Sequence, residues 1–298
     1  MKIETSDFNV IKVFNNNIVL VYQANVQKIL YEKGIGIGKK SGDSISKNAP
    51  IGKIVSIKNK INYDNFQELV NSVDDEVIAL CEEIIYMISK ELNEELHEKV
   101  HISLTDHIAF TLKRIENGDN IKNPFLVEVQ TLFPREFELA KKAAIMIEDK
   151  TKIHFPDDEI GFITLHIHSA RNDEKLSNSV KYAFISNTVI QMIEDESNVK
   201  IDRRSLDYAR FITHIRFAIG RILNNTPIKS KLLNPIKHQY DSSFKLAQQI
   251  SKFVEGELRI KVVEDETAHL ATHIQRFKNV KLKKQKKANI FKQINKEK

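Results

Sequence analysis

The chain has 298 residues, a net charge of +6, 41% hydrophobic residues and 29% charged residues. This length allows two or three domains of ordinary size, and the composition is that of a globular protein. No apolar run approaches the roughly 20 residues that span a bilayer. The first ten residues also lack the apolar core of a signal peptide, so we expect a cytoplasmic protein with no membrane insertion. The single cysteine, Cys81, excludes an internal disulfide.

Positive charge is concentrated at the two ends of the chain. Residues 1–60 hold ten lysines against four acidic residues, and residues 278–298 hold nine lysines against one. The stretch between them is acidic on balance, which favours contact between an end of the chain and a polyanion. We expect residues 281–298 to form a basic, disordered tail with at most an auxiliary, salt-sensitive affinity for RNA.

The first 60 residues have the pattern of a small all-β domain. Apolar residues alternate on both sides of the Asn15–Asn17 run, which is typical of a hairpin. The alternating residues are Ile11, Val13, Ile18, Leu20 and Tyr22. Glycines at positions 34, 36, 38 and 42 then indicate bends or points of close backbone approach.

From about residue 65 the apolar residues recur with a period near 3.6, which predicts helices. Only 9 glycines and 6 prolines occur in the whole chain, which also favours helix. The predicted segments are 65–94, 103–118, 124–150, 157–171, 178–195, 203–223, 230–256 and 264–278.

An internal repeat with an offset of 107 residues divides the helical part in two. Two histidine pairs keep their residue type at this offset, His107 with His214 and His166 with His273. Other matches are Arg114 with Arg221, Ile115 with Ile222, Phe137 with Phe244, Leu139 with Leu246, Ala140 with Ala247, Glu159 with Glu266 and Ile167 with Ile274. The sequence therefore predicts two copies of one all-α domain, over 65–172 and 173–280.

The repeat also separates neighbouring histidines. His166 and His168 flank the same apolar stripe on opposite sides, so periodicity alone does not distinguish them. At the 107-residue offset His168 faces Gln275, whereas His166 faces His273. The repeat therefore points to His166.

Several kinds of chemistry lack the residues they need. A closed zinc site takes four ligands, and no CxxC or HExxH pattern occurs, so we expect no metal. No GxSxG motif or phosphate-binding loop occurs either, so we expect no cofactor and no enzymatic activity. Two interpretations of the repeated histidines stay open: satisfied, half-buried side chains at a helix seam, or acceptors of a phosphoryl group that switches an interface.

Four segments make a family resemblance specific. They are KVFNNN at 12–17, KGIGIGKKSGD at 33–43, LTDHIAFTLKR at 104–114 and EIGFITLHIHSA at 159–170. With them the chain resembles the BglG/LicT/SacY family of transcriptional antiterminators over about residues 8–278. Members of this family carry an N-terminal RNA-binding (CAT) domain followed by two phosphotransferase-system regulation domains (PRDs). The KNPFLVEVQTLFP segment at 122–134 resembles the glucose-specific branch.

The resemblance implies a homodimer that binds an RNA hairpin overlapping a terminator and so activates transcription of a sugar-permease gene. It also implies phosphorylation by the sugar permease, here a glucose enzyme II, on the first PRD and by the phosphocarrier HPr on the second. By motif, the RNA-binding positions are Lys12, Asn15, Asn17, Lys33 and Gly34. The phosphorylated positions would be His107 and His166 in the first PRD, and His214 and His273 in the second.

Two residues depart from the family pattern. Glu32 replaces a glycine at the start of the Gly-rich segment and would bring a carboxylate near RNA phosphate. Ile37 replaces a phenylalanine, which removes a surface for base stacking. The alternative function is therefore a phosphorylation-sensing interaction module, or a DNA-binding regulator, with two PRDs and no antitermination. Because the N-terminal segment reads as strands and no helix-turn-helix precedes the repeats, the pattern disfavours DNA.

Overall fold

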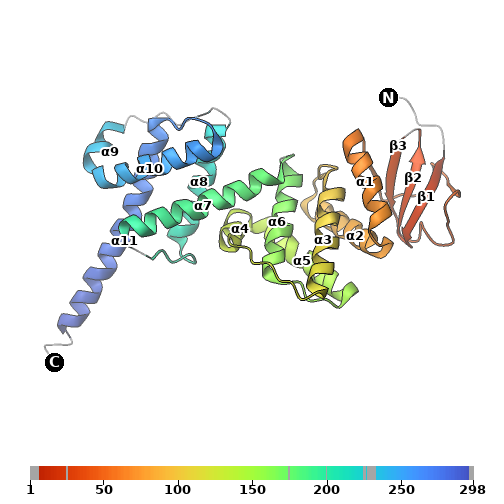
Figure 1. Ribbon diagram of the computed structural model, residues 1–298, viewed down its shortest axis with the longest axis horizontal. Helices are drawn as coiled ribbons and strands as arrows, with labels where there is room; N and C mark the ends of the chain where they lie inside the picture. The colour runs from red at the N-terminus through yellow and green to blue at the C-terminus, as the bar shows by residue number, and fades with distance from the viewer. Residues whose placement is uncertain are drawn as a thin grey trace. The chain divides into compact units, whose positions relative to one another are not determined.

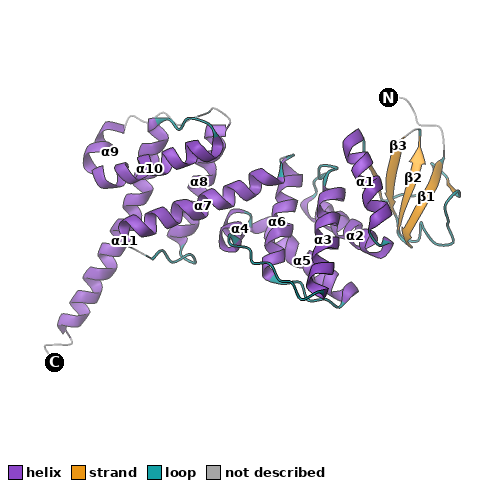
Figure 2. Ribbon diagram, viewed as in Figure 1, coloured by secondary structure: helices purple, strands orange, loops and turns teal. Residues whose placement is uncertain are grey.

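The structure is a computed structural model that describes residues 7–24, 26–173, 175–198, 200–223, 226 and 233–294, the last fifteen of these by their backbone alone. Its contacts form two compact units. The first unit contains residues 1–124 and 135–176, and the second contains residues 125–134 and 177–298. Strands lie in the N-terminal part of the chain and helices follow, as Figures 1 and 2 show.

The N-terminal part is a five-stranded antiparallel sheet in the order β4-β1-β2-β3-β5. Its strands are β1 (Phe8–Asn15), β2 (Ile18–Gln23), β3 (Val26–Tyr31), β4 (Ser44–Ile45) and β5 (Lys53–Ser56). The small β domain predicted from the alternating pattern is confirmed. The register of β1 against β2 shifts twice, between Val10 and Lys12 and between Val13 and Asn15, and such bulges redirect the side chains around them.

Alternation along the strands divides the sheet into two buried faces. Val19 and Val21 point to one side, where the sheet's own loops cover them. Ile18 and Leu20 point to the other side, where they pack on two helices, α1 (Lys60–Ser72) and α2 (Asp75–Leu92). The sheet and the first helices therefore share a hydrophobic core within the first unit.

The rest of the described chain is helical, which confirms the predicted fold class. The first unit also contains α3 (Val100–Glu116), α5 (Pro134–Thr151) and α6 (Asp157–Asn172). The second unit contains α4 (Leu126–Leu132), α7 (Leu176–Ser197), α8 (Leu206–Leu223), α9 (Leu233–Gln239), α10 (Asp241–Leu258) and α11 (Glu264–Ile294). Acidic residues occupy the first turn of both α6 and α11, where their negative charge is attracted to the positive end of the helix dipole.

Three predicted helices are each two helices in the structure. The segment 65–94 is α1 and α2, which meet at the extended residues Val73 and Asp74. The segment 124–150 is α4 and α5, separated before Pro134, where a proline cannot continue the preceding helix. The segment 230–256 is α9 and α10, and its residues 230–232 lie outside the described part of the chain. Periodicity did not reveal these breaks because both halves keep the same apolar period.

The C-terminal segment also differs from the prediction of a disordered tail. The backbone of α11 is helical as far as Ile294, and only residues 295–298 lie outside the described part. Lysine, glutamine and alanine are good helix formers, and the segment contains no glycine or proline to end the helix.

Candidate functional site

The Gly-rich loop after β3 docks on the asparagine turn between β1 and β2. The Gly36 amide donates to the Asn16 carbonyl (2.9 Å), and the Gly34 amide donates to Asn17 Oδ1 (3.0 Å). A Cβ at Gly36 would lie 2.3 Å from the Asn15 carbonyl oxygen, so the approach needs a glycine. The turn and the loop, distant in sequence, therefore form one surface at an end of the sheet.

Three of the predicted RNA-binding residues lie on this surface, which we call the loop surface (residues 16–17 and 32–38). Asn17 and Lys33 are exposed, and Gly34 has the left-handed φ of +80°. Glu32 and Ile37, the two residues that differ from the family pattern, also lie on this surface. The Glu32 carboxylate accepts a hydrogen bond from the Lys33 amide (3.0 Å), so it supports its own loop, and the Ile37 side chain is 66% exposed.

The other two predicted RNA-binding residues contact α1 and α2. Lys12 Nζ lies 2.6 Å from Asp75 Oδ1 and donates to the Val70 carbonyl (3.1 Å). Asn15 Nδ2 donates to Glu83 Oε1 (2.8 Å). In this conformation the structure does not bring all five residues onto one free surface, because acidic residues of α2 hold two of them.

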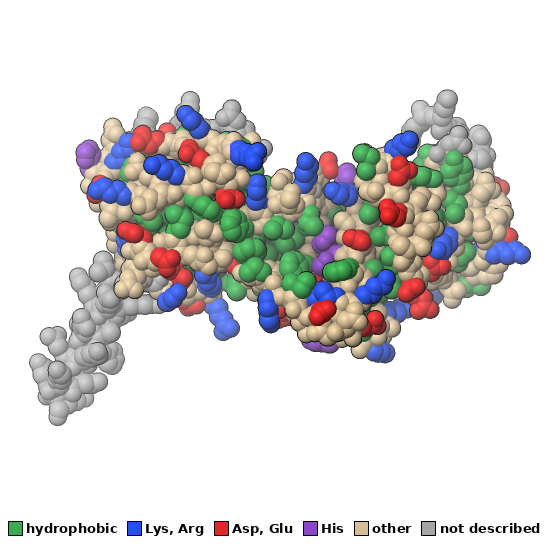
Figure 3. Space-filling view, viewed as in Figure 1, with side chains coloured by type: hydrophobic (Ala, Val, Ile, Leu, Met, Phe, Trp, Pro, Cys, Tyr) green, Lys and Arg blue, Asp and Glu red, His purple; other side chains and the backbone are tan. Residues whose placement is uncertain are grey.

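A groove of about 560 Å³ lies beside Asn15, between the end of β1 and α2. Two carboxylates, Glu76 and Glu83, and one ammonium group, that of Lys150, line it, so its net charge is negative and disfavours a polyanion. On the face drawn in Figure 3, lysine and arginine side chains are interspersed with aspartate and glutamate side chains.

A buried polar network joins the sheet to the helices. The Tyr31 hydroxyl donates to Glu82 Oε2, and His101 Nδ1 lies 2.7 Å from the same oxygen. All three side chains are almost fully buried. Burial and the adjacent carboxyl group raise the pKa of Tyr31 well above its usual value, so the phenol keeps its proton and donates.

The structure brings the two predicted histidines of the first repeat together. His107 on α3 and His166 on α6 have ring centroids 4.9 Å apart, with an interplanar angle of 31°. His107 is partly exposed and His166 is buried. Burial, and then the neighbouring His107, lower the pKa of His166 to about 3, so its imidazole is neutral at pH 7 and keeps a free electron pair.

A buried carboxylate lies beside this first pair. Glu159 Oε2 lies 3.4 Å from His107 Nε2 and accepts a hydrogen bond from Thr111 Oγ1 (3.2 Å). Glu159 Oε1 accepts from Arg114 Nη2 (2.6 Å). Burial alone would raise the pKa of Glu159, but His107 and Arg114 outweigh it and the pKa is lowered.

The second pair repeats this arrangement. His214 on α8 and His273 on α11 have ring centroids 4.1 Å apart, again at an interplanar angle of 31°. Burial, then His214 and His269, lower the pKa of His273 to about 4. Here Arg221 holds Glu266 through two hydrogen bonds of 2.7 Å.

His168, which the repeat did not select, lies apart from this pair. Its Nδ1 lies 3.1 Å from Glu136 Oε1, which also accepts from Arg171 Nη1 (2.7 Å). Burial alone would raise the pKa of Glu136, but the hydrogen bond from His168 and the charges beside it lower this pKa to about 2. His168 therefore belongs to a structural ion-pair network.

The buried ion pairs Arg114–Glu159 and Arg221–Glu266 were not predicted. Their signal was present, because all four residues keep their type at the 107-residue offset. Among the residues that the structure describes, no three His, Cys, Asp or Glu side chains are arranged to hold a metal ion. No helix in that part of the chain is long and apolar enough to cross a membrane.

Comparison with known proteins identifies the class. The family model for the CAT RNA binding domain matches residues 8–64, and the model for the PRD domain matches residues 82–170 and 187–277. The chain is thus an RNA-binding regulator with two PRDs, domains through which the phosphotransferase system acts, and it is not an enzyme.

The relatives identify the family. The chain is 35% identical to Protein GlcT of Staphylococcus saprophyticus (91% of this chain and 98% of the relative). It is 37% identical to the PtsGHI operon antiterminator (91% and 98%) and 32% identical to the transcription antiterminator LicT (89% and 97%), both of Bacillus subtilis. The crystal structure of GlcT CAT-PRDI has 41% sequence identity and covers 56% of this chain and 99% of its own, with a TM-score of 0.48. The chain belongs to the glucose branch of the BglG/LicT family of transcriptional antiterminators.

Proposed function

We propose that this antiterminator acts in the cytoplasm as a homodimer, binds an RNA hairpin that overlaps a terminator, and so activates expression of a glucose-permease gene. Residues 1–60 bind the RNA, and residues 65–172 and 173–280 are the two regulatory domains. A glucose enzyme II phosphorylates His107 and His166, and the phosphocarrier HPr phosphorylates His214 and His273. The relatives' names and the paired histidines support this proposal.

The observation that carries it is the repeated pair of adjacent imidazoles. Ring centroids 4.9 Å and 4.1 Å apart place two nucleophilic nitrogens beside each other in each repeat. Enzymatic catalysis at such a pair would need additional catalytic side chains. Accepting a phosphoryl group needs only a neutral imidazole that a donor protein can reach. A phosphoryl group then adds nearly two negative charges to a helix seam, enough to change the packing.

The setting of the first pair suggests that phosphorylation there silences the protein. A phosphoryl group on His107 would lie beside the Glu159 carboxylate, 3.4 Å from His107 Nε2, and would repel it. That carboxylate joins α6 to Arg114 on α3. Repulsion would therefore loosen the α3–α6 seam in the unit that also carries the RNA-binding sheet.

Exposed phenylalanines offer a docking site for the donor proteins. Phe110 is 62% exposed and Phe217 is 52% exposed, and each lies one turn after the accepting histidine of its helix. The two residues also match at the 107-residue offset. An apolar group at the same place in both repeats supports a protein partner that approaches His107 and His214.

The test is RNA binding by full-length variants. We expect His107→Asp to raise the Kd for the hairpin at least tenfold, because it places a permanent negative charge beside Glu159. His107→Gln is the matched control without the charge and should keep the wild-type Kd. The Kd of the His214→Asp variant shows whether a negative charge in the second PRD also changes RNA binding. Equal Kd values for the His107→Asp variant and the wild type would show that the first PRD is not the off switch. Absence of RNA binding by the wild type would favour an interaction module.

A further inference from the structure

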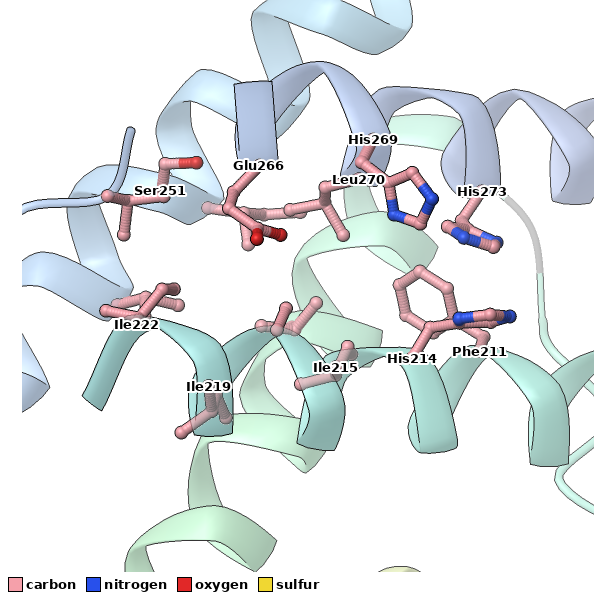
Figure 4. A pocket seen from close by; sticks show the side chains of 15 residues that line it. Phe211, His214, Ile215, Ile219, Ile222, Ser251, Glu266, His269, Leu270 and His273 are labelled. Atoms are coloured by element: carbon pink, nitrogen blue, oxygen red, sulfur yellow. The ribbon is translucent and has the colours of Figure 1, made fainter. Parts of the chain in front are cut away.

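A third imidazole lies beside the second histidine pair. His269 is one turn before His273 on α11, and its ring centroid is 4.9 Å from that of His273 and 6.0 Å from that of His214. Figure 4 shows the three rings together at one end of a pocket, with Ser251 and Ile222 at the other end. At the 107-residue offset the first repeat has Phe162 in this place, packed edge-on against His107 at 6.0 Å.

The surroundings leave these imidazoles as the polar groups at their end of the pocket. The pocket encloses about 50 Å³, and most of the side chains that line it are aliphatic. Glu266 also lines it, but each of its carboxylate oxygens accepts from Arg221 at 2.7 Å. The second site therefore keeps its carboxylate engaged with arginine, whereas Glu159 in the first site faces His107.

All three imidazole rings favour the neutral form. Burial lowers the pKa of His214, of His269 and, to about 4, of His273. The charged groups that act on them are Glu266 and Arg221 and, for the pair, Arg276. A neutral imidazole carries one N–H donor, and a nearby dianion favours its protonated form, which has two.

We infer that His269 is a positioning residue that donates a hydrogen bond to a phosphoryl group carried by His214 or His273, an inference that rests on the proposed function. In the transfer, the P–N bond of the donor breaks, the donor nitrogen keeps the electron pair, and a P–N bond to one ring nitrogen of the acceptor forms. The proton on the other ring nitrogen of the acceptor stays in place. His269 changes no covalent bond. Its charge-assisted hydrogen bond favours the phosphorylated second PRD about tenfold over a site with phenylalanine there.

The test compares full-length wild type, His269→Phe, His269→Gln and the reciprocal variant Phe162→His. Each is phosphorylated with potassium phosphoramidate and, separately, equilibrated with phosphorylated HPr. Tandem mass spectrometry locates the phosphoryl group, since trypsin separates peptide 211–216 from peptide 262–276 and both from the first-repeat histidines. A ³¹P NMR titration then gives the pKa of the phosphoryl group at each site, and thermal unfolding confirms that each variant is folded.

Two results in His269→Phe would support the inference: a phosphoryl occupancy at His214 or His273 about tenfold lower than in wild type, and a higher pKa of the phosphoryl group. His269→Gln should recover part of both effects. Phe162→His should lower the phosphoryl pKa at the first pair. Unchanged occupancy and ³¹P titration in a folded His269→Phe protein would overturn the inference and leave the proposed function standing. A phosphoryl group on His269 itself would also overturn it. If neither donor phosphorylates His214 or His273 in the wild type, the proposed function fails at this domain and the inference fails with it.

Discussion

At the scale of single residues, burial separates the two histidines of the first pair. His107 is partly exposed beside the Glu159 carboxylate, whereas His166 is 8% exposed and its Nδ1 has no hydrogen-bond partner among the described residues. A buried base without an acidic partner resists protonation because the charged form loses its hydration. His166 is therefore held neutral across the physiological range, as its proposed role of phosphoryl acceptor requires.

This neutrality makes stability depend on pH. The pKa of His166 falls from 6.5 to about 3 on folding, so between these values the unfolded chain binds the proton and the folded chain does not. The contribution of neutral His166 to the free energy of unfolding is therefore fully present above pH 6.5. It is lost as the pH falls toward 3, at up to about 1.4 kcal/mol per pH unit. We expect His166→Gln to reduce the slope of the unfolding free energy against pH in this window, measured by urea denaturation. The exposed His238→Gln should keep the wild-type slope, and an unchanged slope in His166→Gln would contradict the account.

At the scale of elements, α2 contacts the RNA-binding sheet through its acidic residues. Asp75 is in the first turn and Glu83 follows two turns later, and they contact Lys12 and Asn15 of β1. RNA that used these two residues would have to displace both carboxylates. The described conformation is therefore one in which the sheet is only partly available to RNA.

Removing these carboxylates should strengthen RNA binding. We expect the double variant Asp75→Asn, Glu83→Gln to lower the Kd of the full chain for the hairpin severalfold, because RNA phosphate no longer competes with them for Lys12 and Asn15. Glu91→Gln removes a charge from the other end of the same helix, where its partner is Lys142, and should have a much smaller effect. A gel-shift titration measures the Kd of each variant. Equal effects on Kd would show that the carboxylates act by long-range electrostatic repulsion and not through their contacts with Lys12 and Asn15.

Glu82 connects the sheet to α2 and α3 from within the core. Glu82→Ala leaves the Tyr31 hydroxyl and His101 buried without their shared acceptor, so we expect a loss of about 3–5 kcal/mol in the free energy of unfolding. Glu91→Ala on the same helix breaks a half-exposed ion pair with Lys142 and should cost less than about 1 kcal/mol. Urea denaturation compares them, and similar losses would mean that the buried network contributes little.

These contacts also mark the limit of what the sequence predicts. Periods of two and 3.6 residues predicted the β domain and the helices, and the 107-residue offset matched His107 with His214 and His166 with His273, because all of these depend on spacing along the chain. That the two histidines of each repeat lie side by side was not predicted. The contacts of Lys12 and Asn15 with α2 could not be predicted, because they depend on how the sheet packs against the helices. The roles of Glu159 and Glu266 were missed for a related reason: a first-turn glutamate is ordinary in a helix until its buried arginine partner is seen.

At the scale of the whole molecule, each repeat presents a histidine pair, and the first shares a unit with the RNA-binding sheet. The proposed mechanism passes through a homodimer, so RNA affinity should depend on protein concentration. We expect the apparent Kd for the hairpin to rise when the protein is diluted below its dimer dissociation constant, as shown by gel shifts beside analytical ultracentrifugation. An apparent affinity that is independent of concentration across that range would indicate binding by the monomer.

The most direct test of the account is a salt-titrated binding measurement of the full chain with a short RNA hairpin that contains an asymmetric internal loop. A duplex DNA of the same length serves as competitor. The account predicts tight binding that weakens linearly in log Kd against log salt, survives excess duplex DNA, and weakens when Asn17 on the loop surface is replaced by Ala. Equal affinity for RNA and duplex DNA, or binding that does not depend on the loop surface, would contradict it.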